Sequence, residues 1–169
     1  MSAKNSNHHA SDKPSGNARR AKLLLVDDDV SIRKILLRLL ADDGYEVESA
    51  PNGEQALEMI SNQAFDLVLL DLNMPEMDGW ETFEQLAEKH PLLPVMIITA
   101  RSNQIASARA AGVSALLEKP LDCRRLLDEI PRLLAEPRQA RLARLAGRPY
   151  SFAFVPPGHI DDSPGKGQS

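Results

Sequence analysis

Short apolar runs alternate with amphipathic stretches along most of this sequence. The run Leu67–Leu70 ends at Asp71 and is followed by Pro75 and the turn pair Asp78-Gly79. A run of this length fits a buried strand of a parallel sheet or a buried piece of helix, and the turn signals behind it favour the strand. The same reasoning predicts strands at residues 22–26, 45–50, 67–70, 94–100 and 115–117.

Between these strands, apolar residues recur at the three- and four-residue spacing of helices that bury one face. In the first such stretch, we expect the core-facing positions to be Ile32, Ile35, Leu36, Leu39 and Leu40. Helices are predicted at residues 31–43, 54–63, 80–90, 103–111 and 122–134. We expect Asp122 to cap the last helix and Pro131 to kink or break it, because proline has no backbone N–H to donate.

Strand and helix therefore alternate five times, which is typical of α/β proteins with a parallel sheet. Right-handed crossovers place helices on both faces of such a sheet. We predict a doubly wound five-stranded parallel sheet with strand order 2-1-3-4-5, in which the first and third strands are neighbours. In sheets of this kind, ligands bind just beyond the carboxyl ends of the strands.

Polar side chains follow the carboxyl ends of four predicted strands. They are Asp27, Asp28 and Asp29 after the first strand, Asp71 after the third, Thr99 after the fourth and Lys119 after the fifth. Several carboxylates in one crevice repel one another, so they favour a cation between them, and oxygen ligands suit Mg²⁺. A hydroxyl and an ammonium group opposite the metal would bind the oxygens of a phosphoryl group. The pattern therefore predicts a Mg²⁺-dependent phosphoryl site.

Over residues 22–136 the sequence resembles the receiver domain of bacterial two-component response regulators. The motifs that carry the resemblance are LLLVDDD, LVLLDLNMPEMDG, MIITA and EKP, in this order. The resemblance implies a flavodoxin-like receiver fold and a phosphorelay function. It also implies that Asp71 accepts the phosphoryl group, as an aspartyl phosphate, from a partner histidine kinase or phosphotransfer protein.

The same resemblance implies a set of metal ligands. Asp28 and Asp71 would bind Mg²⁺ directly, and Asp27 would act mainly through water. The backbone carbonyl of Asn73 would complete the protein ligands. Asp29 is expected to be a solvated loop residue rather than a direct ligand.

For the phosphoryl group itself, the resemblance implies that Thr99 donates a hydrogen bond and that Lys119 forms an ion pair. The Lys119–Pro120 peptide bond would be cis, a conformation that is affordable only before proline. The chain departs from the family pattern at Leu116, where an aromatic residue is usual. An aliphatic side chain buries less area and has no polar group, so we expect weaker coupling to Thr99. Arg101 and Asn73 flank the route of attacking water and are expected to tune the phosphoryl lifetime.

Charge is distributed unevenly along the chain. Residues 21–136 contain 11 Lys and Arg against 21 Asp and Glu, and each end carries a net charge of +3. The acidic middle argues against direct nucleic-acid binding. Residues 1–20 are polar and are expected to be a disordered leader, in which the adjacent His8 and His9 are more simply incidental than a metal site. The apolar runs are shorter than the roughly 20 residues of a membrane span, and the single Cys123 forms no internal disulfide, so we expect a cytoplasmic protein.

The segment after residue 136 has its own pattern. Residues 137–147 predict a short basic helix, and residues 150–155 predict a strand in which Tyr150, Phe152 and Phe154 alternate with smaller residues. This 137–155 extension either packs on the protein's own surface or pairs across a homodimer, or it binds another protein. Residues 156–169 are expected to be disordered. The segment is too short for a DNA-binding domain, so we expect output through a downstream protein target or dimerisation, unless the chain is a fragment.

The sequence therefore favours a stand-alone phosphoacceptor response regulator that is not an enzyme beyond self-catalysed phosphorylation and dephosphorylation. A Mg²⁺-dependent aspartate-nucleophile phosphohydrolase would use similar chemistry. Such an enzyme normally carries Asp-x-Asp after one strand, and Asp71-Leu72-Asn73 lacks the second carboxylate. Further alternatives are a receiver fragment of a larger regulator or hybrid kinase, and a receiver-like fold that serves only as a scaffold.

Overall fold

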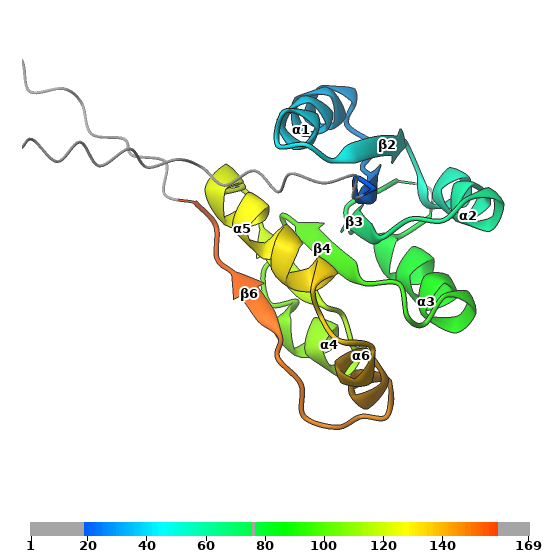
Figure 1. Cartoon of the computed structure of the whole chain (residues 1–169). Coiled ribbons are helices and arrows are strands. Elements are labelled where there is room, and N and C mark those ends of the chain that lie inside the picture. Colours follow the sequence, from blue (N-terminus) through cyan, green and yellow to red (C-terminus); the bar gives the residue numbers. More distant parts are fainter. Residues whose placement is uncertain (1–18, 76, 159–169) are drawn as a thin grey trace, which may run out of the picture.

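The computed structural model describes residues 19–75 and 77–158, which form one sheet with helices on both faces (Figure 1). The expected leader up to residue 18, the His8-His9 pair and the tail from residue 159 lie outside the described residues. The elements in chain order are β1 (Lys22–Val26), α1 (Val30–Asp42), β2 (Glu46–Ala50), α2 (Gly53–Asn62), β3 (Leu67–Asp71), α3 (Gly79–Lys89), β4 (Val95–Thr99), α4 (Ile105–Ala110), β5 (Ala115–Glu118), α5 (Cys123–Leu134), α6 (Arg138–Leu145) and β6 (Ala153–Val155).

The described strands form one parallel sheet with the order β2-β1-β3-β4-β5-β6. The predicted order of the first five strands is confirmed. In the register of the central pair, Val26 lies opposite Leu70, so β1 and β3 end side by side. The sheet is one strand wider than predicted because β6 pairs with β5 at its edge.

Two apolar clusters hold the helices on the sheet, one on each face. Neighbouring strand residues alternate between them, as Leu23 and Leu24 of β1 do. The first cluster also contains residues of α2, α3 and α4, namely Ala56, Ile60, Phe83, Leu86 and Ala108. The second contains residues of α1 and α5, namely Leu36, Leu40, Leu126, Ile130 and Leu133. The sheet is therefore covered on both faces, as its continuous apolar strands require.

Helix α1 differs from the sequence prediction at Ile35, whose side chain is 62% exposed. The buried line of this helix is formed by Leu36 and Leu40, one turn apart. With 3.6 residues per turn, Ile35 points about 100° away from that line, so it lies outside the stripe that reaches the sheet. The expectation that Ile35 faces the core was wrong.

Helix α5 begins and ends where the sequence predicted. Asp122 caps it by accepting hydrogen bonds from the backbone N–H groups of Arg124 and Arg125. The sequence predicted a kink or a break at Pro131. The helix runs to Leu134 without a break, so that part was wrong, and the kink stays a prediction. Proline removes one backbone hydrogen bond, while the buried residues Ile130 and Leu133 on either side keep this turn packed on the sheet.

The extension, defined here as residues 137–158, packs on the surface of its own chain. It begins with α6 and ends beyond β6, which is shown in orange along the edge of the sheet in Figure 1. Regular strand pairing is confined to Ala153–Val155, which is shorter than the predicted strand. Before it, the Tyr150 hydroxyl donates to the carbonyl oxygens of Arg109 and Val113, so this part of the chain turns toward α4 instead of continuing the ladder.

Candidate functional site

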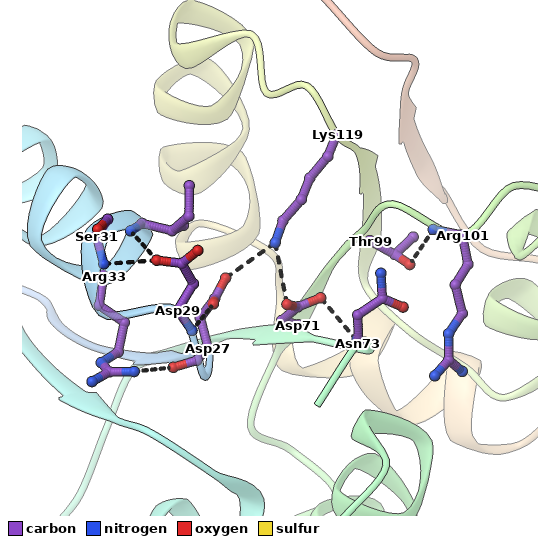
Figure 2. A network of polar contacts seen from close by, with 10 residues as sticks. Asp27, Asp29, Ser31, Arg33, Asp71, Asn73, Thr99, Arg101 and Lys119 are labelled. Carbon is purple, nitrogen blue, oxygen red and sulfur yellow. Dashed lines mark hydrogen bonds and ion pairs between the residues drawn. The ribbon is translucent and has the colours of Figure 1, made fainter. Parts of the chain in front are cut away.

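The carboxyl ends of β1, β3, β4 and β5 bring most of the predicted site residues to one edge of the sheet (Figure 2). The Nζ atom of Lys119 lies 3.1 Å from Asp71 Oδ2 and 3.2 Å from Asp27 Oδ2. Asp71 is the last residue of β3, whereas Asp27 and Lys119 directly follow β1 and β5. Because parallel neighbours end at the same edge, three separate segments supply one charged cluster.

The two carboxylates at the centre are buried, with exposed fractions of 2% for Asp27 and 3% for Asp71. Burial raises the pKa of Asp71, and the charge of Asp27 acts in the same direction, against the N–H of Asn73 and the ammonium of Lys119. Burial alone would lower the pKa of Lys119, but the charges of Asp71 and Asp27 outweigh it and raise that pKa. The pKa of Asp71 thus rises mainly because of burial, whereas the pKa of Lys119 rises because two carboxylates face one ammonium. The cluster therefore keeps an excess of negative charge.

The acidic loop after β1 has a fixed shape. The backbone N–H of Asp29 donates to Asp27 Oδ1 over 2.8 Å, and Asp29 itself caps α1 by accepting from Ser31 and Ile32. These backbone N–H groups lower the pKa of Asp29. Asp29 is exposed and serves as a helix cap, and its expected absence from the metal ligands stays a prediction.

Three carboxylates are close enough to bind one metal ion. Oxygen atoms of Asp27, Asp28 and Asp71 lie within 4.8 Å of one another, and Asp28 is exposed at the mouth of the site. A set of carboxylate oxygens with access to water suits Mg²⁺, which retains part of its hydration shell. Burial, and to a smaller extent the charge of Asp27, raises the pKa of Asp71, and a cation beside this carboxylate would favour its charged form. The residues present therefore fit a hard divalent cation.

The backbone of Asn73 lies beside the carboxylate cluster. Its N–H donates to Asp71 Oδ1 over 3.0 Å, on the side of the carboxylate that faces away from Lys119 (Figure 2). This hydrogen bond fixes one oxygen of Asp71 while Lys119 holds the other. The use of the Asn73 carbonyl as a metal ligand stays a prediction.

Thr99 ends β4 one residue beyond Ile98, which pairs with Asp71 in the sheet. Its side chain is buried, and its Oγ1 atom accepts a hydrogen bond from the backbone N–H of Arg101 over 2.9 Å. The Arg101 guanidinium forms an ion pair of 3.3 Å with Asp78, the residue that caps α3. The loops after β3 and β4 are thus tied together beside Asp71.

The residue Lys119 is also held through its backbone. Its N–H donates to the carbonyl oxygen of Thr99 over 2.8 Å, and the Lys119–Pro120 bond is cis, as the resemblance implied. On the preceding strand, Leu116 is fully buried in the apolar cluster on the α4 side. Phe152 of the extension packs against the same cluster.

The sequence did not indicate two further contacts around the site. A guanidinium nitrogen of Arg33, on α1, donates to the backbone carbonyl of Asp27 over 2.5 Å. Trp80 Nε1 donates to Gln104 over 3.0 Å, which joins the start of α3 to the loop after β4. Nothing in the pattern distinguishes Arg33 from its exposed neighbours Lys34 and Arg38, because all three lie on the polar side of α1.

The sheet order and the acidic pocket at its carboxyl edge define a flavodoxin-like domain of the CheY type. A family model of the response regulator receiver domain matches residues 23–131, and the chain belongs to this family. Members are receiver domains of two-component systems, in which phosphorylation and Mg²⁺ are typical. No helix in the described part of the chain combines the length and hydrophobicity that a membrane span needs.

Curated relatives are longer than this chain. The transcriptional regulatory protein ZraR of Klebsiella oxytoca is 42% identical over 124 residues, which cover 72% of this chain and 28% of that protein. The response regulator MprA of Mycobacterium sp. (strain KMS) is 40% identical over 117 residues, which cover 67% of this chain and 50% of that protein. The similarity thus spans between about a quarter and a half of these relatives.

Solved receiver structures match nearly over their full length. A CheY-like receiver domain protein from Methanospirillum hungatei JF-1 has a TM-score of 0.65 at 32% identity, covering 69% of this chain and 94% of that chain. The response regulator TrrA from Thermotoga maritima, solved in complex with Mg²⁺ and BeF, has a TM-score of 0.63 at 29% identity, covering 67% and 98%. These matches confirm the predicted fold class.

Proposed function

We propose that this chain is a phosphoacceptor response regulator in which Asp71 takes a phosphoryl group from a partner histidine kinase or phosphotransfer protein. The observation that carries the proposal is the pair of buried carboxylates, Asp27 and Asp71, that share the ammonium of Lys119. A structural ion pair needs one carboxylate per ammonium. A second buried carboxylate beside the first suits a site built to receive a divalent cation and a phosphoryl group.

In the proposed reaction, a carboxylate oxygen of Asp71 attacks the phosphorus atom of a phosphohistidine. The P–N bond breaks, and the leaving imidazole takes up a proton from water. Lys119 pairs with a phosphoryl oxygen, and the Thr99 hydroxyl donates a hydrogen bond to another, so the charge that develops in transfer is stabilised. Asp27, Asp28, Asp71 and the Asn73 carbonyl would hold Mg²⁺, which when bound supplies further neutralisation of that charge.

The proposed output is a change of binding partner or of dimer state. We assign the receiver to residues 21–136, and we propose a cytoplasmic protein that contacts a downstream protein target instead of nucleic acid or a membrane. The net negative charge of the receiver supports this assignment. The relatives ZraR and MprA extend well beyond the matched region. A stand-alone regulator is therefore a proposal for this chain and not a property of these relatives.

The test is stoichiometric labelling of the full chain by acetyl phosphate in Mg²⁺, followed by intact-mass measurement. Wild type is expected to gain one phosphoryl group, and Asp71→Asn none. The matched control is Asp66→Asn, because Asp66 lies at the opposite end of β3 in an ion pair with Arg19 and should not affect labelling. Full labelling of Asp71→Asn would remove Asp71 from the role. Sustained turnover of a generic phosphoester would favour a phosphohydrolase instead.

A further inference from the structure

The strand β5, which leads directly into Lys119, is paired on both sides. On one side it pairs with β4, and on the other with β6 of the extension, where Leu116 lies opposite Phe154 and Leu117 opposite Val155. Val155 is 5% exposed and packs in the apolar cluster between the sheet and α5. Without β6, β5 would be an edge strand with one row of unpaired backbone groups.

The extension is fixed to the receiver before it reaches β5. Arg144 of α6 is buried and donates to Glu136 at the end of α5. The Tyr150 hydroxyl donates to the Arg109 carbonyl over 2.9 Å and the Val113 carbonyl over 3.2 Å. These contacts lie at the C-terminal end of α5 and around α4. The part of the extension that precedes β6 is therefore bound to the receiver.

Beyond β6, the chain contacts the loop that carries the active-site lysine, which we define as the lysine loop, residues 119–122. The backbone N–H of Gly158 donates to the carbonyl oxygen of Pro120 over 2.8 Å. Gly158 also lies against the backbone of Asp122, the cap of α5. From the opposite side, Thr99 holds the loop through the N–H of Lys119. The lysine loop is therefore held between β4 and the extension.

We infer that residues 153–158 are a positioning segment for Lys119, and that docking of this segment is linked to the filling of the Asp71 site. The inference rests on the proposed function. Lys119 reaches two buried carboxylates at 3.1 and 3.2 Å, and its Nζ atom can meet a phosphoryl oxygen only if its backbone stays in place. A displacement of about 1 Å in a positioned group is enough to slow a reaction by about a hundredfold.

Linkage gives the inference a second consequence. If a docked segment favours the lysine position that binds the phosphoryl group, then a bound phosphoryl group must favour the docked segment by the same factor. Filling the site should therefore slow hydrogen exchange of the Gly158 amide. This readout does not depend on turnover or on any partner protein.

The matched variants for the test are Gly158→Pro and Gly158→Ala in the full chain. Proline removes the N–H that Pro120 accepts. Alanine retains it, and a Cβ atom at this position would meet its nearest neighbours at 3.5 Å, which is ordinary contact. A second pair is Val155→Thr, which puts a hydroxyl into the buried β6 position, and Ser151→Thr at an exposed position of the extension just before β6.

The measurements are the initial rate of Asp71 labelling by acetyl phosphate, the Mg²⁺ concentration at half-maximal rate, and amide exchange with and without Mg²⁺-beryllofluoride. We expect Gly158→Pro and Val155→Thr to label about tenfold more slowly, with Mg²⁺ half-saturation unchanged, since Lys119 is not a metal ligand. Gly158→Ala and Ser151→Thr should label as wild type. Beryllofluoride should slow exchange of the wild-type Gly158 amide by about fivefold or more.

Equal labelling rates in Gly158→Pro and Gly158→Ala would overturn the inference while leaving the proposed function intact. Unchanged Gly158 exchange in wild type that binds beryllofluoride would do the same. A loss of Mg²⁺ affinity in parallel with the rate would also count against it, because it would indicate general damage to the site. A wild-type chain that is not labelled at all would instead remove the proposed function, and the inference with it.

Discussion

The Nη1 atom of Arg144 lies 2.6 Å from Oε1 of Glu136, and both side chains are largely removed from solvent. This pair joins α6 to the end of α5. Arg141 lies on the other side of the same carboxylate, with its Nε atom 3.5 Å from Glu136 Oε2. The basic residues that give this helix its charge thus include two that face inward onto one glutamate, so the extension begins as part of the folded domain.

We predict that Arg144→Met lowers the free energy of unfolding by about 3 kcal/mol, because it leaves the largely buried Glu136 without its closest partner. The measurement is urea unfolding at neutral pH, followed by circular dichroism. Arg138→Met removes the same charge from an exposed position of the same helix and should change stability by less than about 0.5 kcal/mol. Equal stability of the two variants would mean that the Arg144–Glu136 pair does not anchor the extension.

The Tyr150 hydroxyl provides a pH-dependent test of the same region. Burial raises its pKa above the ordinary value of 10.0, while Arg144 and Arg109 oppose the rise. The folded state therefore holds the phenol proton more tightly than the unfolded state. The stability that this hydroxyl contributes is fully present below pH 10 and is lost as pH rises through the folded pKa.

Tyr150→Phe should accordingly cost about 1 kcal/mol at pH 8, where the hydrogen bonds to Arg109 and Val113 are intact. The difference between wild type and Tyr150→Phe should shrink as pH is raised above 10. Urea unfolding of both proteins across this range measures it, and the other titrating groups cancel in the comparison. A difference that stayed constant with pH would show that the Tyr150 hydroxyl is not buried in this way.

The centre of the site could be predicted from sequence because each of its residues follows a local signal. Asp27, Asp71 and Thr99 lie at the ends of continuous apolar runs, and Lys119 follows a shorter one. The alternation of strands and helices then fixes a parallel sheet, in which such ends must meet at one edge. Local pattern and topology together are therefore sufficient for the cluster of Asp27, Asp71 and Lys119.

Other features depend on packing that no local pattern encodes. The pairing of Phe154 with Leu116 and the ion pair of Arg144 with Glu136 follow from where the extension turns back onto the sheet. The sequence showed the aromatic and basic residues of the extension, but it did not decide whether they contact this chain, a second copy or another protein. Ile35 was wrongly predicted to face the core for a similar reason. Its spacing fits the apolar face of α1, but the contact between α1 and the sheet is too narrow to include it.

For Lys119, the geometry predicts that removing the ammonium slows labelling without weakening metal binding. Lys119→Met should slow labelling of Asp71 by about a hundredfold, because one charged donor to the phosphoryl oxygens is lost. Mg²⁺ affinity should stay the same or increase, since Lys119 now neutralises the carboxylates of Asp27 and Asp71 that a cation would occupy. Acetyl phosphate labelling and isothermal titration calorimetry measure the two effects. Lys89→Met, at an exposed helix end, is the control.

If Lys119→Met labelled at the wild-type rate, the ion pair with Asp71 would be structural only. If it lost Mg²⁺ affinity, Lys119 would be needed to keep the acidic loop in shape, and the proposed competition between ammonium and metal would be wrong. The two measurements therefore separate a role in transfer from a role in holding the pocket.

Neighbouring acids after β1 give the sharpest test of the metal site. Asp28 has an oxygen within 4.8 Å of those of Asp27 and Asp71, whereas Asp29 caps α1. Asp28→Asn should weaken Mg²⁺ binding by at least about tenfold, because a proposed ligand loses its charge. Asp29→Asn should leave it nearly unchanged, since asparagine caps a helix as well as aspartate does.

Both variants remove one negative charge from adjacent positions of the same loop, so any general electrostatic effect is shared. Calorimetric titration with Mg²⁺ gives the affinity, and the Mg²⁺ dependence of acetyl phosphate labelling gives a second value. Equal weakening in Asp28→Asn and Asp29→Asn would show that only the net charge of the loop matters. Stronger weakening in Asp29→Asn would place the metal on the other acid, and the ligand set would have to be assigned again.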